Sequence, residues 1–407
     1  MQRNLFRYLL LVFLVFVAAF GLSSAYSQSA SPVSRLRILS AKNMKCDGNT
    51  DDTPAFNTLI SRAVSGNGPA QAPVELRTIQ LPTGKCRFAS APRVIPAGIK
   101  IIGNGNRNGT WLIADYNESN HQNGFLTWDG SFRLLGGGAG GGLEHLHISK
   151  GSGKVGGTAI RIAGIDDGHR ASFMVFDDLY INSAFGAPGY WHHHLIADGR
   201  CCTAEGSNGI RDIILNNFHF GQSKPPDGAS ILIFNGVHFY ITNGLIFASD
   251  GGGIRISGQD GADNHMSHDI LITNVNILGT LYIEHADGIV YSGWLAGQLT
   301  TADSKNCFIS GVIQGAIANA GGCAIVTTDL ISTSGPIQTN DDDFAGTLVM
   351  HNGNATHHFN HKFHIPPVCI ASDNQAASPV RVTVDIDGLT VSGQDNHQIS
   401  YICIARE

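Results

Sequence analysis

The feature that most constrains this chain is a strand-like unit that ends in a tight bend and recurs along the sequence. The clearest copy, Asp269–Asp287, contains three short apolar segments separated by bends at Asn274 and Gly279: Ile270–Ile272, Val275–Leu278 and Leu281–Glu284. The bend follows a short pattern: an aliphatic residue, any residue, and then Asn or Gly. The same pattern predicts further bends at positions 217, 243 and 311, and a weaker one at Ser183. Asn and Gly accept left-handed backbone angles at low cost. The steps of 34, 26, 31 and 37 residues predict a solenoid with loops of variable length.

A second recurring strand supports this interpretation. Gly157–Gly164, Asp227–Gly236 and Gly252–Gly258 each begin with small residues and continue with alternating aliphatics. The alternation puts Arg161, Leu232 and Arg255 on the face opposite the aliphatics, and Tyr282 falls in the same column. An antiparallel β-sandwich also has short strands and glycine turns. A sandwich has no reason to repeat the same bend and strand in fixed order.

The amino-acid composition narrows the fold class. Charged residues make up 14% of the 407-residue chain, and 50 residues are glycine, whereas typical domains have about 25% charged residues and about 7% glycine. Walls with few charges and corners rich in glycine suit a β-solenoid. The formal net charge of −6 gives no support for a nucleic-acid partner, which usually selects a basic patch.

Residues 1–25 are typical of a signal peptide. Arg3 and Arg7 precede the apolar run Leu9–Leu22, and Ser23–Ala25 offers small residues for cleavage. The run is short for a membrane span of about 20 residues, and no later stretch resembles one. We therefore expect a secreted or periplasmic protein without stable membrane insertion, with a mature chain that starts near Tyr26.

Eight cysteines in an exported chain indicate disulfides. The most local pairing joins Cys46 to Cys86, Cys307 to Cys323 and Cys369 to Cys403. It leaves Cys201 beside Cys202, either as a vicinal disulfide, as two thiols, or with one of them paired elsewhere.

The folded part opens with an acidic stretch and a helix. Thr53 and Pro54 suit the start of the helix, and Phe56, Leu59, Ile60 and Ala63 make one apolar face. Such a helix can cover the open end of a solenoid. We interpret the acidic stretch Asp47–Asp52 as structural.

The N-terminal motifs carry a resemblance to a known superfamily. The runs DGNTDDTPAFNTLI, LPTGKC and IKIIGNG, within about residues 45–105, resemble the start of pectate-lyase-like right-handed parallel β-helix proteins, and the recurring bends extend the resemblance to about residue 330. It implies an all-β, single-stranded right-handed parallel β-helix over residues 36–335, with three sheets per coil and an N-terminal capping helix. Beyond a junction, residues 341–407 alternate as strands of a small antiparallel β module.

The resemblance also implies a substrate groove along the first sheet of the coil. Carried over by position, Arg161, Arg255, Tyr282 and Glu284 face outward in that groove, and Asp250, Asp260, His285 and Asp287 lie at its flanks. We expect Asp250, Arg255, Tyr282, Glu284 and Asp287 as catalytic candidates, and Arg161 and His285 as substrate-binding candidates. Arginine suits acidic sugars, a carboxylate pair suits hydrolysis, and Arg or Tyr suits β-elimination. A structural ion pair between Arg255 and Glu284 is the rival account.

The chain departs from the best-known members of the superfamily. The polygalacturonase constellation is missing, and no calcium motif of pectate lyases is evident. The expected function is an exported carbohydrate-active protein that cleaves a polysaccharide, with hydrolysis ahead of β-elimination. The alternative is a non-catalytic glycan-binding, adhesin-like or tailspike-like surface protein.

A long loop before residue 195 carries aromatic and histidine residues. We expect Tyr190 and Trp191 to be exposed and to stack on sugars, although a loop packed on the coil is equally compatible with the sequence. The adjacent His192, His193 and His194 suggest a metal. However, neighbouring positions on a strand face opposite sides, and no carboxylate spacing completes a recognised site. We therefore expect no metal ion and no cofactor, while the sequence leaves the oligomeric state open.

Overall fold

The computed structural model is a stack of parallel coils followed by a small antiparallel module. It describes residues 37–65, 77–105, 108–130, 140–166, 170–183, 189–201, 209–247, 252–258, 266–319, 323–330, 338–339, 345–359, 366–373, 375 and 380–404. Residues 1–36, which include the expected signal peptide, lie outside this range. Within it, no helix is long and apolar enough to cross a membrane.

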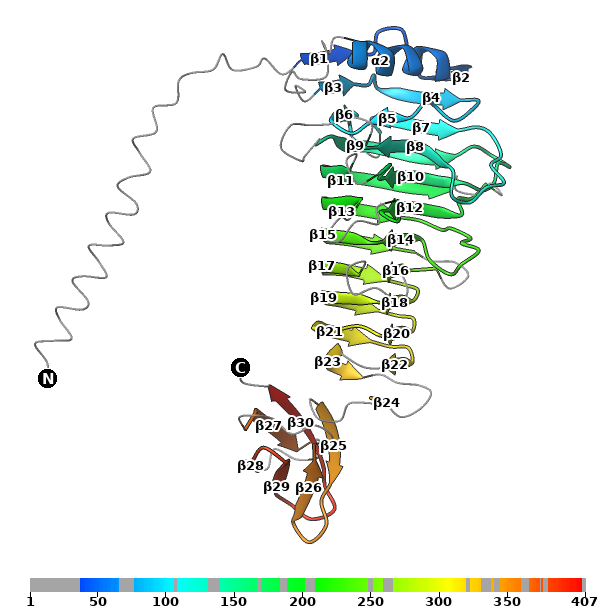
Figure 1. The fold of residues 1–407 in the computed structure, drawn as a ribbon. Helices are drawn as coiled ribbons and strands as arrows, with labels where there is room; N and C mark the ends of the chain where they lie inside the picture. Colours follow the sequence, from blue (N-terminus) through cyan, green and yellow to red (C-terminus); the bar gives the residue numbers. More distant parts are fainter. Residues whose placement is uncertain are drawn as a thin grey trace, which may run out of the picture. The chain divides into compact units, whose positions relative to one another are not determined.

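The larger of two parallel sheets, sheet A, forms one wall of the coil (Figure 1). Its main path of neighbouring strands is β1 (Arg37–Ser40), β3 (Arg77–Gln80), β6 (Ile99–Ile102), β9 (Gly142–Lys150), β11 (Ala171–Ser183), β13 (Ile210–Phe220), β15 (Gly236–Ile246), β17 (Ser267–Ile277), β19 (Ala286–Leu295), β21 (Cys307–Ile313) and β23 (Cys323–Leu330). Three further strands join it off this path: β2 (Asp47–Asp51), β4 (Gly84–Phe88) and β7 (Thr110–Ala114).

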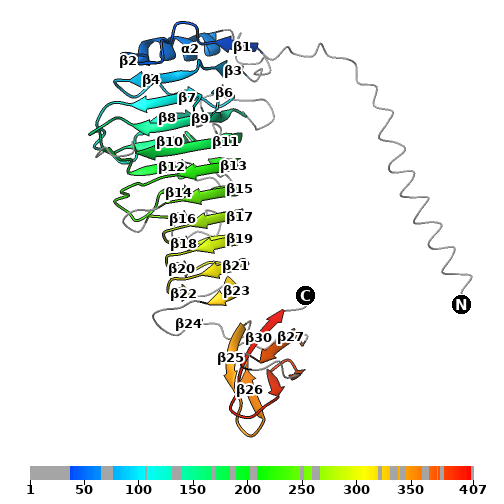
Figure 2. The same ribbon diagram turned by 180° about the vertical axis from the view of Figure 1, so that it is seen from behind.

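Sheet B forms the second wall. It contains, in order, β5 (Ile95–Pro96), β8 (Gly124–Asp129), β10 (Thr158–Ala163), β12 (His193–Asp198), β14 (Ile231–Phe234), β16 (Ile254–Ser257), β18 (Leu281–Glu284), β20 (Leu299–Ala302), β22 (Ile317–Asn319) and β24 (Gln338–Thr339). Viewed from behind, the strands of the two sheets again alternate along the chain from coil to coil (Figure 2).

The expected bends form a column inside sheet A. Asn217, Asn243 and Asn274 are left-handed, with φ between 49° and 55°, and Gly311 also has a positive φ. In the coil before them, the prediction of a bend at Ser183 is wrong. The left-handed residue is Asp178, which strand pairing aligns with Asn217. A short Asp side chain tolerates this backbone region as Asn does.

These bends lie within continuous hydrogen-bonded strands. The expected segments Ile270–Ile272 and Val275–Leu278 belong largely to one strand, β17, whose backbone turns at Asn274. In the N-terminal coils, three separate strands form three ladders: β3 with β6, β4 with β7 and β5 with β8. From β9 onward the first two ladders run through one bent strand, so each later coil contributes to two hydrogen-bonded sheets.

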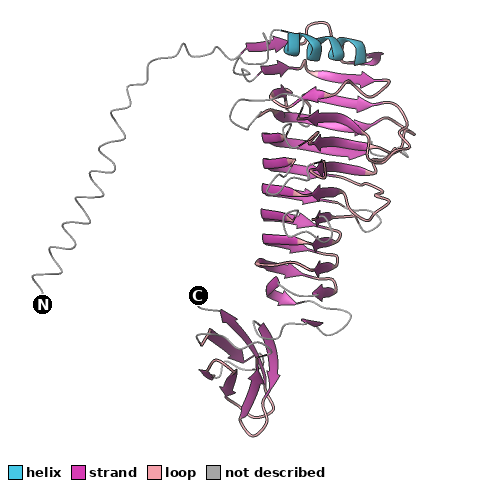
Figure 3. Cartoon of the chain, viewed as in Figure 1, coloured by secondary structure: helices cyan, strands magenta, loops and turns pink. Residues whose placement is uncertain are grey.

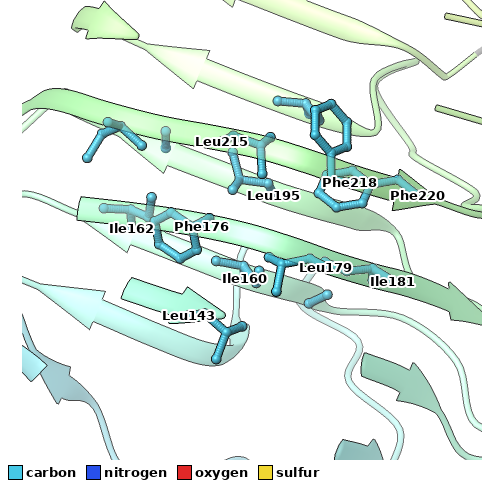
Figure 4. Packing of buried hydrophobic residues seen from close by; sticks show 14 of the residues in the cluster. Leu143, Ile160, Ile162, Phe176, Leu179, Ile181, Leu195, Leu215, Phe218 and Phe220 are labelled. Carbon is cyan, nitrogen blue, oxygen red and sulfur yellow. The ribbon is translucent and has the colours of Figure 1, made fainter. Parts of the chain in front are cut away.

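Apolar side chains fill the space between the sheets in columns (Figure 4). Strand pairing places Leu143, Phe176 and Leu215 in one column. Ile160 and Leu195 face them from sheet B in another. Because burying each such side chain contributes about 1.5–3 kcal/mol, every coil adds its own share of core.

The N-terminal helix is confirmed as α2 (Thr53–Ser65), the single helix among the described residues (Figure 3). Phe56, Leu59, Ile60 and Ala63 are buried on its inner face. The acidic stretch binds nearby backbone: Asp51 Oδ1 accepts from the Thr53 amide at 3.0 Å, and Asp52 Oδ1 accepts from the Lys45 amide at 2.7 Å. These contacts are structural.

The C-terminal module is antiparallel, as expected. One sheet holds β25 (Ala345–Val349), β30 (Gln398–Ile404) and β27 (Val368–Asp373). The other holds β26 (Asn354–His358), β29 (Gly388–Ser392) and β28 (Arg381–Val384). The right-handed parallel β-helix with a capping helix and an antiparallel C-terminal module is thereby confirmed as the fold class.

Three expected disulfides are present: Cys46–Cys86, Cys307–Cys323 and Cys369–Cys403. Cys201 is also disulfide-bonded, while Cys202 lies outside the described residues. Disulfides on this scale are typical of proteins from oxidising compartments.

Candidate functional site

The outward side of sheet B carries two parallel rows of side chains, which we call the sheet B face. In the first row, strand pairing aligns Arg161, Ile196, Leu232, Arg255, Tyr282 and Thr300. In the second row it aligns Ala163, Asp198, Phe234, Ser257, Glu284 and Ala302. The alternate residues of these strands, such as Ile254 and Leu281, point into the core. The expected shared face of Arg161, Arg255, Tyr282 and Glu284 therefore exists.

Glu284 is the centre of one polar cluster on this face. Its Oε1 accepts from Arg255 Nε at 3.1 Å and from Ser257 Oγ at 2.7 Å. Its Oε2 accepts from the Tyr282 hydroxyl at 2.8 Å. The Arg255 guanidinium lies 4.9 Å from the centre of the Tyr282 ring. The ion pair that we considered as the rival account is thus present in the structure.

The cluster fixes the protonation states of its members. Burial alone would raise the pKa of the Glu284 carboxyl, but the hydrogen bonds from Arg255, Ser257 and Tyr282 outweigh it and hold the pKa below its ordinary value. The hydrogen bond to Glu284, together with burial, raises the pKa of the Tyr282 hydroxyl. At neutral pH Glu284 is ionised and Tyr282 keeps its proton.

Asp198 is the centre of a second cluster. One of its oxygens accepts from Arg200 Nε at 2.8 Å, and the other accepts from Arg200 Nη2 at 3.0 Å and Arg161 Nη2 at 3.2 Å. Burial would raise the pKa of the Asp198 carboxyl, but Arg200 and Arg161 hold it below its ordinary value. Two guanidinium groups therefore share this one ionised carboxylate.

An apolar strip separates the two clusters. Ile196 and Leu232 lie on the sheet B face but are only 1–2% exposed, because they pack with Ala229 outside the main core. Phe234 packs against them, and the Arg200 guanidinium lies 4.1 Å from its ring centre. Stacked guanidinium groups and rings thus border this strip.

The remaining groove candidates that the structure describes are His285 and Asp287, and neither belongs to the two rows of the face. His285 takes a left-handed bend directly after β18. Asp287 belongs to β19 of sheet A, where its Oδ1 accepts from Asn306 Nδ2 at 2.8 Å. Asp250 and Asp260 lie outside the described residues.

The loop before β12 differs from expectation at one residue. Tyr190 is partly exposed, with Lys224 Nζ 5.0 Å from its ring centre. The prediction that Trp191 is exposed is wrong, because its ring is fully buried in the core. Lys150 Nζ, itself buried, lies 4.5 Å from the Trp191 ring and 4.6 Å from the Tyr116 ring. Burial lowers the pKa of Lys150 to about 8.

Two features escaped the sequence reasoning. On the side of sheet A that faces away from the core, four rings are in contact from coil to coil: Trp111, His147, Tyr180 and His219, with neighbouring centres 4.1–4.8 Å apart. Tyr180 and His219 are stacked, whereas His147 meets Tyr180 edge to face. The second feature is a group of His121, His193 and Asp227, whose metal-binding atoms all lie within 4.8 Å of one another. Burial lowers the pKa of His193, so its imidazole is neutral at pH 7. Aligning the residues of successive coils would have revealed most of this row of rings, because His147, Tyr180 and His219 each lie two residues after a left-handed residue.

Comparisons with known proteins concern architecture only. No family model matches the sequence, and no curated protein sequence matches it. Among solved structures, the A-module of mannuronan C-5 epimerase AlgE6 from Azotobacter vinelandii is 11% identical with a TM-score of 0.38, covering 72% of this chain and 90% of that one. The Dettilon tailspike protein is 9% identical with a TM-score of 0.30, covering 90% and 94%. The surface adhesin PfbA of Streptococcus pneumoniae is 12% identical with a TM-score of 0.28, covering 78% and 97%. Since no score reaches 0.5, the fold assignment rests on the strand pairing itself.

Proposed function

We propose that this chain is an exported glycan-binding protein whose sheet B face holds a polysaccharide that carries carboxylate groups. One observation carries the proposal. Arg161 and Arg200, with side chains 29% and 41% exposed, share the single and mostly buried carboxylate of Asp198. Such a cluster has more positive than negative charge, and planar guanidinium groups match sugar carboxylates in geometry.

The second cluster extends the same surface along the coil. Arg255 and Tyr282 present a guanidinium stacked on a ring, which is held in place by Glu284. Side chains whose positions are already fixed lose little conformational entropy when a ligand binds. A sugar chain that spans the two polar clusters would therefore meet prepared side chains at both, while Ile196 and Leu232 between them are covered.

The protonation states favour binding over hydrolysis. Hydrolysis by paired carboxylates needs one of them protonated at working pH, which requires a raised pKa. On the sheet B face the pKa values of Glu284 and Asp198 are both lowered. The raised pKa of Tyr282 keeps its hydroxyl protonated at neutral pH, so it is not available there as a base. We therefore rank glycan binding above the polysaccharide cleavage expected from the sequence.

The test combines binding and product assays on the mature chain. Polygalacturonate, alginate and a neutral β-glucan are compared by affinity electrophoresis, with release of reducing ends and of unsaturated uronate followed in parallel. We expect retardation by the carboxylated glycans alone, weakened by salt, and no products. Release of either product would instead establish an enzyme.

Variants locate the surface. Arg161→Ala and Arg255→Ala should each weaken binding several-fold. Arg211→Ala is the matched control, because Arg211 forms a similar half-exposed ion pair with Asp212 at 2.9 Å on sheet A. Equal binding in all three variants, or no binding of any carboxylated glycan by the wild type, would refute the proposal.

A further inference from the structure

The connections that lead into sheet B bring two histidines and one carboxylate together. His121 lies before β8, His193 is the first residue of β12, and Asp227 lies before β14. Strands β8, β10, β12 and β14 are successive neighbours in sheet B (Figure 1). The group therefore gathers side chains from three of four consecutive coils.

His193 is oriented as a metal ligand would be. Its side chain is fully buried, and its Nδ1 lies 2.7 Å from the carbonyl oxygen of Ala229. A carbonyl oxygen only accepts, so Nδ1 carries the proton and Nε2 carries the lone pair. Nε2 is buried and has no hydrogen-bond partner among the described residues. A backbone carbonyl that fixes the tautomer in this way is typical of metal-binding histidines.

The other two side chains can adjust. His121 is half-buried and Asp227 is exposed. Asp227 Oδ1 lies 3.7 Å from His193 Nδ1, which is beyond hydrogen-bond distance. Bonds of about 2.0–2.2 Å to an ion would hold the ligand atoms roughly 3–4 Å apart. A site around His193 Nε2 requires His121 and Asp227 to rotate at the surface to that spacing while His193 stays in place.

We propose that His121, His193 and Asp227 bind one divalent metal ion of the zinc class. Two imidazole nitrogens and a carboxylate oxygen suit Zn²⁺ or Co²⁺, whereas Ca²⁺ and Mg²⁺ prefer oxygen ligands throughout. Three protein ligands beside an exposed Asp227 leave the fourth position to water. The ion ties together connections from separate coils, so its binding stabilises the folded stack.

The sequence-based expectation of no metal considered only neighbouring positions. His192 and His194 flank His193 but are not members of the group, because the residues that complete it come from other coils. The site is independent of the proposed glycan-binding face, since none of its three residues belongs to the two rows of that face.

The experiment uses the mature chain without a histidine tag. The protein is treated with EDTA and dialysed, then titrated with ZnCl₂ in a calorimeter and with CoCl₂ under visible absorbance. We expect one ion per chain, d–d bands typical of a Co²⁺ site with nitrogen and oxygen ligands, and a rise in the thermal unfolding midpoint with ZnCl₂. His121→Ala and Asp227→Asn should each weaken binding at least about tenfold, since loss of even an outer-shell partner costs that much.

The controls address the chain's 18 histidines. His145→Ala removes a surface histidine that pairs with Asp178 at 3.0 Å on sheet A, and it should bind Zn²⁺ like the wild type. The variants are made at His121 and Asp227 because neither is buried, and circular dichroism checks that they fold. Absence of stoichiometric Zn²⁺ binding by the wild type would overturn the proposal, as would unchanged affinity in His121→Ala and Asp227→Asn.

Discussion

The side-chain amide of Asn274 donates a hydrogen bond to Oδ1 of Asn243 over 2.8 Å, so the bend of one coil is bonded to the bend of the coil before it. Both residues are left-handed, with φ of 54° and 55°. The same side chain thus serves the backbone conformation within its coil and the contact between coils.

Replacing Asn274 should therefore affect stability in two separable ways. Asn274→Ala loses the hydrogen bond to Asn243, which contributes about 1 kcal/mol to stability. It also puts alanine at a positive φ, which costs about a further 1–2 kcal/mol because the alanine side chain cannot hydrogen-bond to the local backbone. Asn274→Gly should lose the first contribution only. Urea unfolding measures both losses of stability. Asn276→Ala is the control, because Asn276 is also exposed but is not left-handed. If the Ala and Gly variants lost equal stability, the left-handed backbone at position 274 would not contribute to the effect of Asn274→Ala.

Glu284 should make stability depend on pH. Its folded pKa lies below the ordinary 4.5, so its contribution is fully present above that value and is lost as the pH falls through the folded pKa. Glu284→Gln should lower the free energy of unfolding by about 1–3 kcal/mol at pH 7, because Arg255 loses its charge partner. The difference from wild type should shrink below about pH 4.5 in melts across the acid range. A constant difference at every pH would show that the carboxylate charge is not responsible.

Lys150 should also make stability rise with pH, but in the alkaline range. Burial lowers its pKa to about 8 from the ordinary 10.5, so the unfolded chain binds more protons between these values and stability rises with pH there. Lys150→Met removes this titration and keeps a similar side-chain volume between Tyr116 and Trp191. We expect the variant to be more stable than the wild type at pH 7, with the gap narrowing towards pH 10. A variant that is less stable at pH 7 would show that the ring contacts of the ammonium outweigh its burial.

The C-terminal disulfide should hold its module together. Cys369 and Cys403 are opposite residues of β27 and β30. The double variant Cys369→Ser/Cys403→Ser should lose about 3–4 kcal/mol from that module, as expected for a loop of this length. Limited proteolysis with mass spectrometry should then cut within residues 345–404 at a lower temperature while the coil stays intact. An unchanged cleavage temperature, after peptide mapping has confirmed the bond in the wild type, would contradict this role.

The sequence predicted the coil because its signals are local. The bends at Asn217, Asn243 and Asn274 need a residue tolerant of positive φ, and the apolar alternation of β16 and β18 is visible within a few residues. The same alternation predicted that the side chains of Arg255 and Tyr282 point away from the core. Asp178 was missed because the bend pattern allowed Asn, Gly and, more weakly, Ser, but not Asp.

Contacts between coils were harder to predict. The burial of Trp191 depends on what the neighbouring coil supplies, here Phe125 and Lys150. The meeting of His193 with Asp227 depends on the length and course of the connection before β14. Contacts between residues of different coils depend on which residues of neighbouring strands pair. The apolar pattern of a single sequence does not predict that pairing to within one residue.

The alignment of the bends also defines a segment of the chain that can be removed as one complete turn. Asn217 and Asn243 occupy equivalent places in adjacent coils, so an in-frame deletion of residues 218–243 would join Asn217 to Gly244 and remove one whole turn of the solenoid. Strand β14 would disappear, and the two arginine clusters of sheet B would move closer by one strand spacing, about 4.8 Å. Insertion or deletion of a single turn therefore changes the distance between the two clusters by one strand spacing at a time. The core of the remaining turns keeps its packing.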